Sequence, residues 1–185
     1  MNLFKIFIFI LISLTISIKV NSNEELINIL KEGGNLIFIR HAYAPGNGDP
    51  ENFIIKDCLT QRNLDLNGKN QSKKIGLFFK NNLIKVDKVL SSQWCRCKDT
   101  AFLAFKDFEE KSFLNSFYDS KFAKNKKTQI SELKEYINNW PTEKNLVLVT
   151  HYVVISEILN FYPSSGEIVI ANKEYKVIGN LEIKN

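Results

Sequence analysis

Both histidines of this 185-residue chain follow directly after a short, wholly apolar run. Residues 36–39 lead to Arg40 and His41, and residues 146–149 lead through one threonine to His151. An apolar run of this length between polar neighbours is typical of a strand that is buried on both faces. Two such strands in one parallel sheet end at the same edge, so we expect the two imidazoles to lie close together.

Helical and strand-like patterns alternate along the rest of the sequence. Strands separated by long helices predict an α/β domain with a mainly parallel sheet. The glycine- and proline-rich stretch 42–62 is predicted to be a loop, whereas 112–117 suits a short strand or an extended loop. The predicted helices are 24–31, 67–80, 94–105, 128–139 and 152–161. The predicted strands are 36–39, 86–90 and 146–149, followed by a hairpin of 167–170 with 175–178.

The predicted strand at 86–90 brings an arginine to the same edge of the sheet. It leads through two serines to Arg96, at the start of the helix predicted for 94–105. Taken alone, a histidine at a strand end is more often structural, and a single arginine is more often the partner of a surface ion pair. Here three strand ends bring two histidines and two arginines to one crevice, so their joint placement favours a functional site.

This set of side chains fits phosphoryl transfer through a covalent histidine. A neutral imidazole nitrogen is a nucleophile near neutral pH, and a phosphohistidine divides one difficult displacement into two easier steps. We assign His41 as that nucleophile. The guanidinium groups of Arg40 and Arg96 suit the charged oxygens of the transferred group, and His151 is expected to act as a second clamp.

Three segments resemble motifs of the histidine phosphatase superfamily, in the order that the family has them. Residues 36–42 resemble the nucleophile motif, residues 91–101 the motif of the second arginine, and residues 146–151 the closing strand with the second histidine. The resemblance implies a phosphoglycerate mutase-like fold, a three-layer sandwich around a mainly parallel sheet. It also implies a phosphatase that needs no metal and no other cofactor. Ala42 departs from the usual Arg-His-Gly pattern and is expected to crowd the phosphate pocket by one methyl group.

The resemblance further implies a carboxylic acid that protonates the leaving group, in the segment between Arg96 and His151. Asp119 is the first choice, because it follows the extended segment that is expected to end near the crevice. Such an acid must hold its proton near the working pH. The other candidates are Asp49, Asp57 and Glu132.

Arg62 and several aromatic residues are candidates for the substrate mouth. In the family, the neighbourhood of Arg62 lines this mouth, so the side chain either contacts the substrate or forms a structural ion pair. Tyr152 is expected to wall the pocket together with Phe53 and Trp94. The second arginine and the second histidine are only 55 positions apart, which leaves little room for an inserted cap domain, so we expect an open crevice.

The first 22 residues have the layout of a secretory signal peptide, with an early lysine, an apolar run at 6–18 and a small residue at the end. That run is short of the roughly 20 residues that cross a bilayer, so no permanent membrane span is expected after cleavage. We therefore expect export to the periplasm or secretion, with 23–185 forming one domain. Without Lys5 and Lys19, the formal charge of +5 falls to a mild basic excess, which does not favour nucleic acid as a partner.

The three cysteines are Cys58, Cys95 and Cys97. One disulfide can persist in an oxidising compartment. Cys95 and Cys97 are too close in the sequence to pair comfortably, so Cys58 is expected to pair with one of them. A zinc site built from cysteines and histidines is the alternative, although the paired two-residue spacing of structural zinc motifs is missing.

The sequence therefore predicts a phosphatase that hydrolyses phosphomonoesters through a phosphohistidine on His41. Its substrate is expected to be a phosphorylated small molecule, a lipid headgroup or a phosphoprotein. Two alternatives stay open. One is a phosphate-ester-binding module without hydrolysis, and the less favoured one is a phosphomutase.

Overall fold

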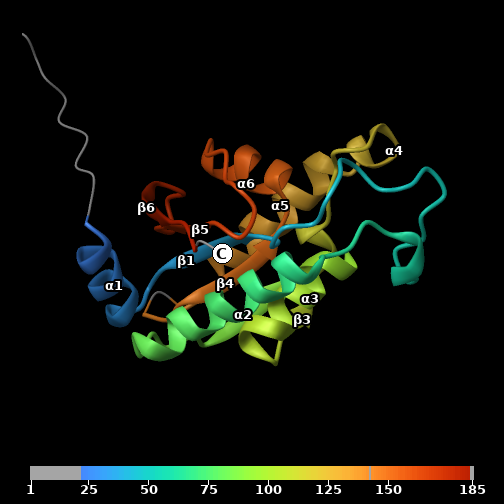
Figure 1. Cartoon of the computed structure of the whole chain (residues 1–185). Helices are drawn as coiled ribbons and strands as arrows, with labels where there is room; N and C mark the ends of the chain where they lie inside the picture. Colours follow the sequence, from blue (N-terminus) through green and yellow to red (C-terminus); the bar gives the residue numbers. More distant parts are fainter. Residues whose placement is uncertain (1–21, 142, 184–185) are drawn as a thin grey trace, which may run out of the picture.

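The buried apolar runs of the sequence form the centre of a six-stranded sheet in the order β3-β2-β4-β1-β5-β6 (Figure 1). The computed structural model describes residues 22–141 and 143–183. The strands are β1 (Leu36–Arg40), β2 (Lys88–Ser91), β3 (Glu109–Glu110), β4 (Leu146–Thr150), β5 (Ile168–Ala171) and β6 (Val177–Leu181). The helices are α1 (Asn23–Glu32), α2 (Leu66–Asn81), α3 (Cys95–Phe105), α4 (Ser120–Ala123), α5 (Lys126–Asn138) and α6 (Tyr152–Leu159), and two 3-10 turns are η1 (Cys58–Thr60) and η2 (Ser112–Leu114).

The two strands that precede the histidines are direct neighbours. β1 and β4 pair in parallel, with Arg40 opposite Thr150. The pairing continues one residue further, because the backbone N–H of His41 donates to the carbonyl of Thr150 over 2.9 Å. β2 is parallel to β4 on its other side, while β5 and β6 run antiparallel at the far edge. The predicted mainly parallel sheet is thus confirmed, and the ends of β1, β2 and β4 meet at one edge.

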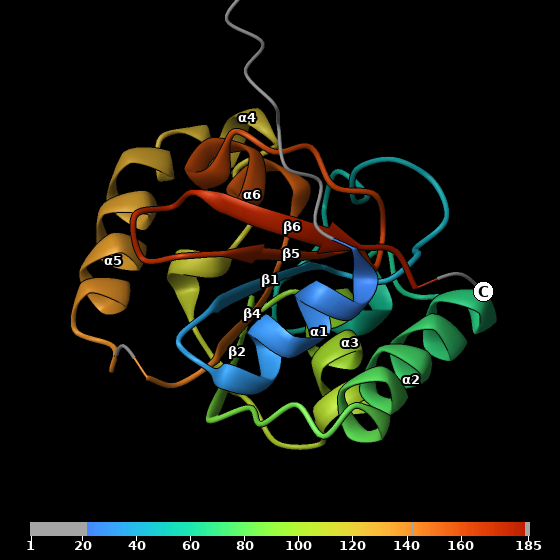
Figure 2. The same ribbon diagram turned by 90° about the vertical axis from the view of Figure 1, so that its left-hand side faces the viewer.

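Helices cover both faces of the sheet, as Figures 1 and 2 show. Alternate strand residues point to opposite faces. One set, including Ile37 and Val147, packs against apolar residues of α1, α2 and α3. The other set, including Phe38 and Leu148, packs against α5 and α6. The three-layer α/β sandwich is therefore confirmed.

α2 and α3 pack closely on their face of the sheet. A Cβ atom at Gly76 would collide with the backbone of Ala104, so this contact requires glycine. The approach fixes α3, and with it the residues at the start of α3 that face the crevice.

The segment 112–117 is predicted to be a short strand or an extended loop, and the strand alternative is wrong. β3 lies just before it, at Glu109–Glu110, and 112–114 form a 3-10 turn. The reason is a side chain from α5: Nε2 of Gln129 donates to the carbonyls of Ser112 and Asn115 over 3.0 and 2.9 Å. These carbonyls are satisfied by an amide group, so they do not pair with a neighbouring strand.

The predicted signal peptide lies outside the described residues, except for Ser22. The hydroxyl of Ser22 accepts a hydrogen bond from the backbone N–H of Glu25 and so caps α1. Among the described residues, no helix has both the length and the apolar character that a membrane span needs.

Candidate active site

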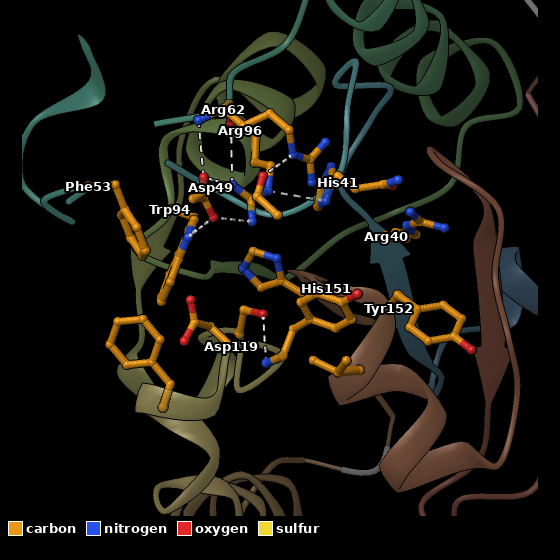
Figure 3. Close-up of a pocket in the computed structure, with 16 residues that line it drawn as sticks. Arg40, His41, Asp49, Phe53, Arg62, Trp94, Arg96, Asp119, His151 and Tyr152 are labelled. Atoms are coloured by element: carbon orange, nitrogen blue, oxygen red, sulfur yellow. Dashed lines mark hydrogen bonds and ion pairs between the residues drawn. The ribbon is translucent and has the colours of Figure 1, made fainter. Parts of the chain in front are cut away.

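A cavity of about 230 Å³ opens at the edge where β1, β2 and β4 end (Figure 3). Arg40 and His41 reach it from the end of β1, Arg96 from the start of α3, and His151 from the end of β4. The four residues expected at one crevice are therefore brought together. Figure 3 shows the two imidazoles side by side, and their ring centroids are 5.4 Å apart.

His41 is buried and is held in one tautomer by the backbone of the next residue. Its Nδ1 lies 2.8 Å from the carbonyl oxygen of Ala42, which only accepts hydrogen bonds, so Nδ1 carries the proton. Nε2 then holds a lone pair and accepts a hydrogen bond from Nε of Arg96 over 3.2 Å. Burial and then the charge of Arg96 lower the pKa of His41 well below 6.5. The ring is thus neutral near pH 7, with Nε2 as its basic nitrogen.

His151 is oriented by Ser92, the residue that directly follows β2. Its Nε2 lies 2.9 Å from the hydroxyl of Ser92, which is also 3.1 Å from Oδ1 of Asn115. Sγ of Cys97 lies 3.5 Å from the same nitrogen, so these two contacts are both made at Nε2. Burial, followed by Arg96 and His41, lowers the pKa of His151 well below its usual value. A bound dianion would oppose these effects and favour the imidazolium, in which both nitrogens donate.

Arg96 is buried at the start of α3, where a carboxylate holds its guanidinium group. Its two terminal nitrogens donate to the two oxygens of Asp49 over 2.8 and 3.1 Å. The exposed fractions of the Arg96 and Asp49 side chains are only 4% and 9%. The fork is therefore fixed, and its Nε points to His41.

Arg40 and Arg62 add two further guanidinium groups to the cavity wall. Arg40 donates to the carbonyl of Pro163 over 2.9 Å and lies 5.6 Å from the ring centre of Tyr152. Arg62 donates to the carbonyls of Gly48 and Ala44, so backbone oxygens hold it in place of the ion pair that was the alternative. Burial lowers the pKa of both arginines, which nevertheless remain cations at neutral pH. The cavity thus has a strongly positive side.

Aromatic rings also line the cavity (Figure 3). Phe53, Trp94 and Phe122 pack against one another with ring centroids 5.6 to 5.8 Å apart. Tyr152 lines the cavity at the start of α6, beside Arg40. The predicted positions of Phe53, Trp94 and Tyr152 on the wall agree with this arrangement.

Two of the four carboxylates proposed as the acid line the cavity. Asp119 lies at its mouth, where the carboxylate caps α4 by accepting from the N–H of Lys121 over 2.9 Å. Asp49 also lines the cavity, bound to Arg96. Asp57 instead caps η1 on the exposed loop, and Glu132 lies on α5 beside a separate surface groove, so neither is placed to reach the site.

Ala42 does not lie where the sequence suggested. It is fully buried against Ala44 and Leu64 and is not part of the cavity wall, so its methyl group does not crowd the pocket. The backbone at Ala42 also avoids positive φ, so alanine is accommodated without strain. Its contribution to the site is the carbonyl that orients His41.

Sequence reasoning missed the polar residues that hold the histidines and Arg96 of the cavity in place. Thr100 accepts a hydrogen bond from the N–H of Ala42 over 3.0 Å and donates to the carbonyl of Arg96 over 2.7 Å, which ties β1 to α3. Ser92 orients His151. The signal was present in the double serine and in the Thr-Ala pair of the segment 91–101, but the pattern alone did not give their partners.

Cys58 and Cys95 form a disulfide with Cα atoms 5.6 Å apart. The expected partner of Cys58 is therefore Cys95, the residue directly before Arg96. Cys97 is free and buried, and burial raises the pKa of its thiol to about 12. The zinc alternative is wrong for these cysteines because two of them are bonded to each other, and no group of metal-ligating side chains occurs in the described part of the chain.

Loss of this disulfide is expected to destabilise the protein. Closing a loop over a separation of 37 residues stabilises a fold by roughly 4 kcal/mol through the unfolded state. The free energy of unfolding, measured with urea, should fall by this amount when the parent protein is reduced. The Cys58→Ser variant should be as stable as the reduced parent, and its stability should not change when reductant is added. Equal stability of the oxidised and reduced parent would contradict the expectation.

The sequence matches no protein-family model, and no curated protein matches it. Solved structures nevertheless share its architecture. The protein histidine phosphatase SixA, solved in complex with tungstate, aligns with a TM-score of 0.52 at 14% identity, over 81% of this chain and 96% of that one. A phosphoglycerate mutase from Thermus thermophilus aligns with a TM-score of 0.58 at 15% identity, over 81% of this chain and 99% of that one. The chain thus has the fold of the phosphoglycerate mutase-like histidine phosphatases.

Proposed function

We propose that the protein is a metal-independent histidine phosphatase that hydrolyses phosphomonoesters through a phosphohistidine on His41. The observation that carries the proposal is the environment of one atom. Nε2 of His41 holds a lone pair in a cavity that also contains a second imidazole, with ring centroids 5.4 Å apart, and three guanidinium groups. A nucleophile surrounded by fixed cations is what transfer of an anionic phosphoryl group requires.

The reaction has two steps. In the first, Nε2 of His41 bonds to phosphorus while the bond from phosphorus to the ester oxygen breaks, and Asp119 gives its proton to that oxygen. In the second, water bonds to phosphorus, Asp119 takes a proton from the water, and the bond to Nε2 breaks with its electron pair returning to the imidazole. The same carboxyl group acts first as an acid and then as a base.

The cations stabilise the transferred group in both steps. Arg40, Arg62 and Arg96 lie around the cavity and face the negative charge that spreads over the phosphoryl oxygens. His151 donates from Nδ1 to one of these oxygens, while Ser92 holds its Nε2. None of these groups needs to move far, because backbone and side-chain hydrogen bonds already fix them.

The two carboxylates of the cavity differ in their fitness as a proton donor. Burial raises the pKa of Asp49, but hydrogen bonds and charge from Arg96, with donors from Arg62 and Trp94, outweigh burial and lower it overall. Asp49 is therefore ionised and bound on both oxygens. The carboxylate of Asp119 contacts the exposed residue Lys121: its Oδ1 accepts from the backbone N–H of Lys121, and its Oδ2 lies 3.8 Å from Nζ of the same lysine. Its position at the mouth of the cavity supports it as the acid.

The Asp119→Asn variant is expected to show a loss that depends on the leaving group. Asparagine also caps helices well, so α4 should persist and only the proton donor is removed. Hydrolysis of an alkyl phosphate should fall by about 10²- to 10⁴-fold. Hydrolysis of an aryl phosphate, whose leaving group needs little protonation, should change much less.

Glu132→Asn is the control for this experiment, because Glu132 lies beside a different groove. The ratio of kcat/KM for the alkyl and aryl substrates should be unchanged in this variant. Equal losses on both substrates in Asp119→Asn would exclude Asp119 as the acid.

The function itself is tested by phosphate release from a panel of phosphate esters, without added metal and with a chelator present. We expect turnover by the purified protein. Binding of inorganic phosphate or vanadate without turnover of any ester would instead identify a binding module, and transfer of phosphate between two hydroxyl groups would identify a mutase.

We also propose that the protein works outside the cytoplasm, after loss of a signal peptide that ends near residue 22. The Cys58–Cys95 disulfide supports this, because such bonds persist in oxidising compartments. The substrate is then a phosphorylated small molecule, a lipid headgroup or a phosphoprotein. Cell fractionation and amino-terminal sequencing test the location, and an uncleaved cytoplasmic protein would contradict it.

A further inference from the structure

Asp49 accepts more hydrogen bonds than Asp119, the other carboxylate that lines the cavity. Its Oδ1 accepts from Arg96 over 2.8 Å and from the backbone N–H of Arg62 over 3.0 Å. Its Oδ2 accepts from Arg96 over 3.1 Å and from Nε1 of Trp94 over 3.0 Å. Figure 3 shows the carboxylate on the far side of the Arg96 guanidinium group from His41. Every one of these donors lies on a residue that itself lines the cavity.

We propose that Asp49 is a positioning residue that aims Arg96 at the phosphoryl group. This inference rests on the proposed function. Asp49 binds one N–H of each terminal nitrogen of Arg96, and Nη1 also donates to the carbonyl of Arg62 over 3.3 Å. The donors left for a ligand are therefore the second N–H of Nη2 and Nε, which points to Nε2 of His41 over 3.2 Å. The bond to phosphorus forms at that nitrogen. Asp49 therefore places a fixed N–H donor beside the reacting atom.

A free arginine fork would bind phosphate differently. Guanidinium groups prefer to bind phosphate through two parallel hydrogen bonds from neighbouring nitrogens. With Asp49 in place, Arg96 can do this through Nε and Nη2, whereas without Asp49 it would be able to turn its two terminal nitrogens to the ligand instead. It would then no longer be held in the orientation that serves the transition state, so the reaction would slow although the bound anion could keep two hydrogen bonds.

The charge of Asp49 affects the binding of phosphate. Three guanidinium groups face one cavity, and Asp49 supplies the negative charge bound directly to one of them. This lowers the positive potential that a phosphate ion meets and so favours release of the product. Asp49 thus limits affinity for the ground state and preserves orientation for the transition state.

The Asp49→Asn variant separates these effects. An amide has one accepting oxygen and one donating nitrogen. The nitrogen would replace a carboxylate oxygen of Asp49, so it would face N–H donors to which it cannot bond. We expect kcat to fall by about 10- to 100-fold. We expect the inhibition constant of inorganic phosphate to fall about 3- to 10-fold, which means tighter binding.

Asp57→Asn is the matched control. Asp57 lies on the same loop and caps η1, and its carboxylate accepts from the N–H of Leu59 over 3.0 Å, away from Arg96. This variant removes the same charge and should leave both constants within about 2-fold of the parent. Thermal melts of all three proteins report whether the loop is intact.

Two results would overturn the proposal. An unchanged or higher kcat in Asp49→Asn would mean that Asp49 competes with the substrate for Arg96. A lower kcat together with weaker phosphate binding would mean that Asp49 only maintains the fold of the loop. Calorimetry with inorganic phosphate gives the affinity even if the parent protein shows no turnover, so failure of the proposed function is distinguishable from failure of this inference.

Discussion

Replacement of His41 by alanine is expected to lower hydrolysis of an aryl phosphate on the order of 10⁴-fold or more. The variant loses the only atom that we assign to bonding with phosphorus, Nε2, and an aryl leaving group does not compensate for a missing nucleophile. The binding groups stay in place, because Arg96 remains fixed by Asp49. The measurement is kcat, with the affinity for inorganic phosphate determined in parallel.

The His41→Ala variant should therefore bind phosphate within about 10-fold of the parent while its turnover is lost. His41 is buried, so a denaturant curve must show that the variant is folded. Residual turnover within about 10-fold of the parent would contradict a covalent role for His41. Loss of both turnover and phosphate binding in a folded variant would point to a binding role instead.

Replacement of Arg96 is expected to affect catalysis and stability through separate physical causes. Arg96→Lys keeps a charge but loses the planar fork and the Nε donor, so kcat should fall by about 10²- to 10³-fold. Arg96→Ala also leaves the buried carboxylate of Asp49 without its partner, which should cost about 3–5 kcal/mol in the free energy of unfolding. Kinetics and urea unfolding of both variants give the two quantities.

A double variant tests the second of these causes. Arg96→Ala with Asp49→Asn removes the unpaired charge as well, so it should recover a large part of the stability lost in Arg96→Ala but none of its activity. Wild-type activity in Arg96→Lys, or no recovery of stability in the double variant, would contradict the roles that we give to this ion pair.

The sequence predicted the centre of the fold because its strands are unusually simple. The runs 36–39 and 146–149 contain no polar residue, so they had to be buried on both faces, and parallel pairing then placed His41 beside His151. The place of Arg96 near the start of α3 was also predictable, because the predicted strand at 86–90 leads through two serines to a helical pattern at 94–105. The site residues at the ends of strands could therefore be predicted from the sequence.

The conformation of the loop 42–62 could not be predicted from the sequence, because tertiary contacts determine it. Asp49 meets Arg96 across 47 positions, and the amide oxygen of Gln61 meets the N–H of Cys95 across 34. No local pattern specifies such pairs. The sequence therefore indicates Asp49 only as a candidate for the acid and does not indicate its bond to Arg96. The same holds for the segment 112–117, whose turn depends on the side chain of Gln129 in α5.

The most direct test is to look for the covalent bond. A mixture of the parent protein and a phosphate ester, quenched in alkali within one turnover, should contain a phosphate group that is stable to alkali, labile to acid and attached to the peptide that carries His41. It should form at least as fast as kcat and be absent from His41→Ala. Turnover by the parent without any phosphate on His41 would contradict the account. Phosphate that appears on another residue at least as fast as kcat would also contradict it.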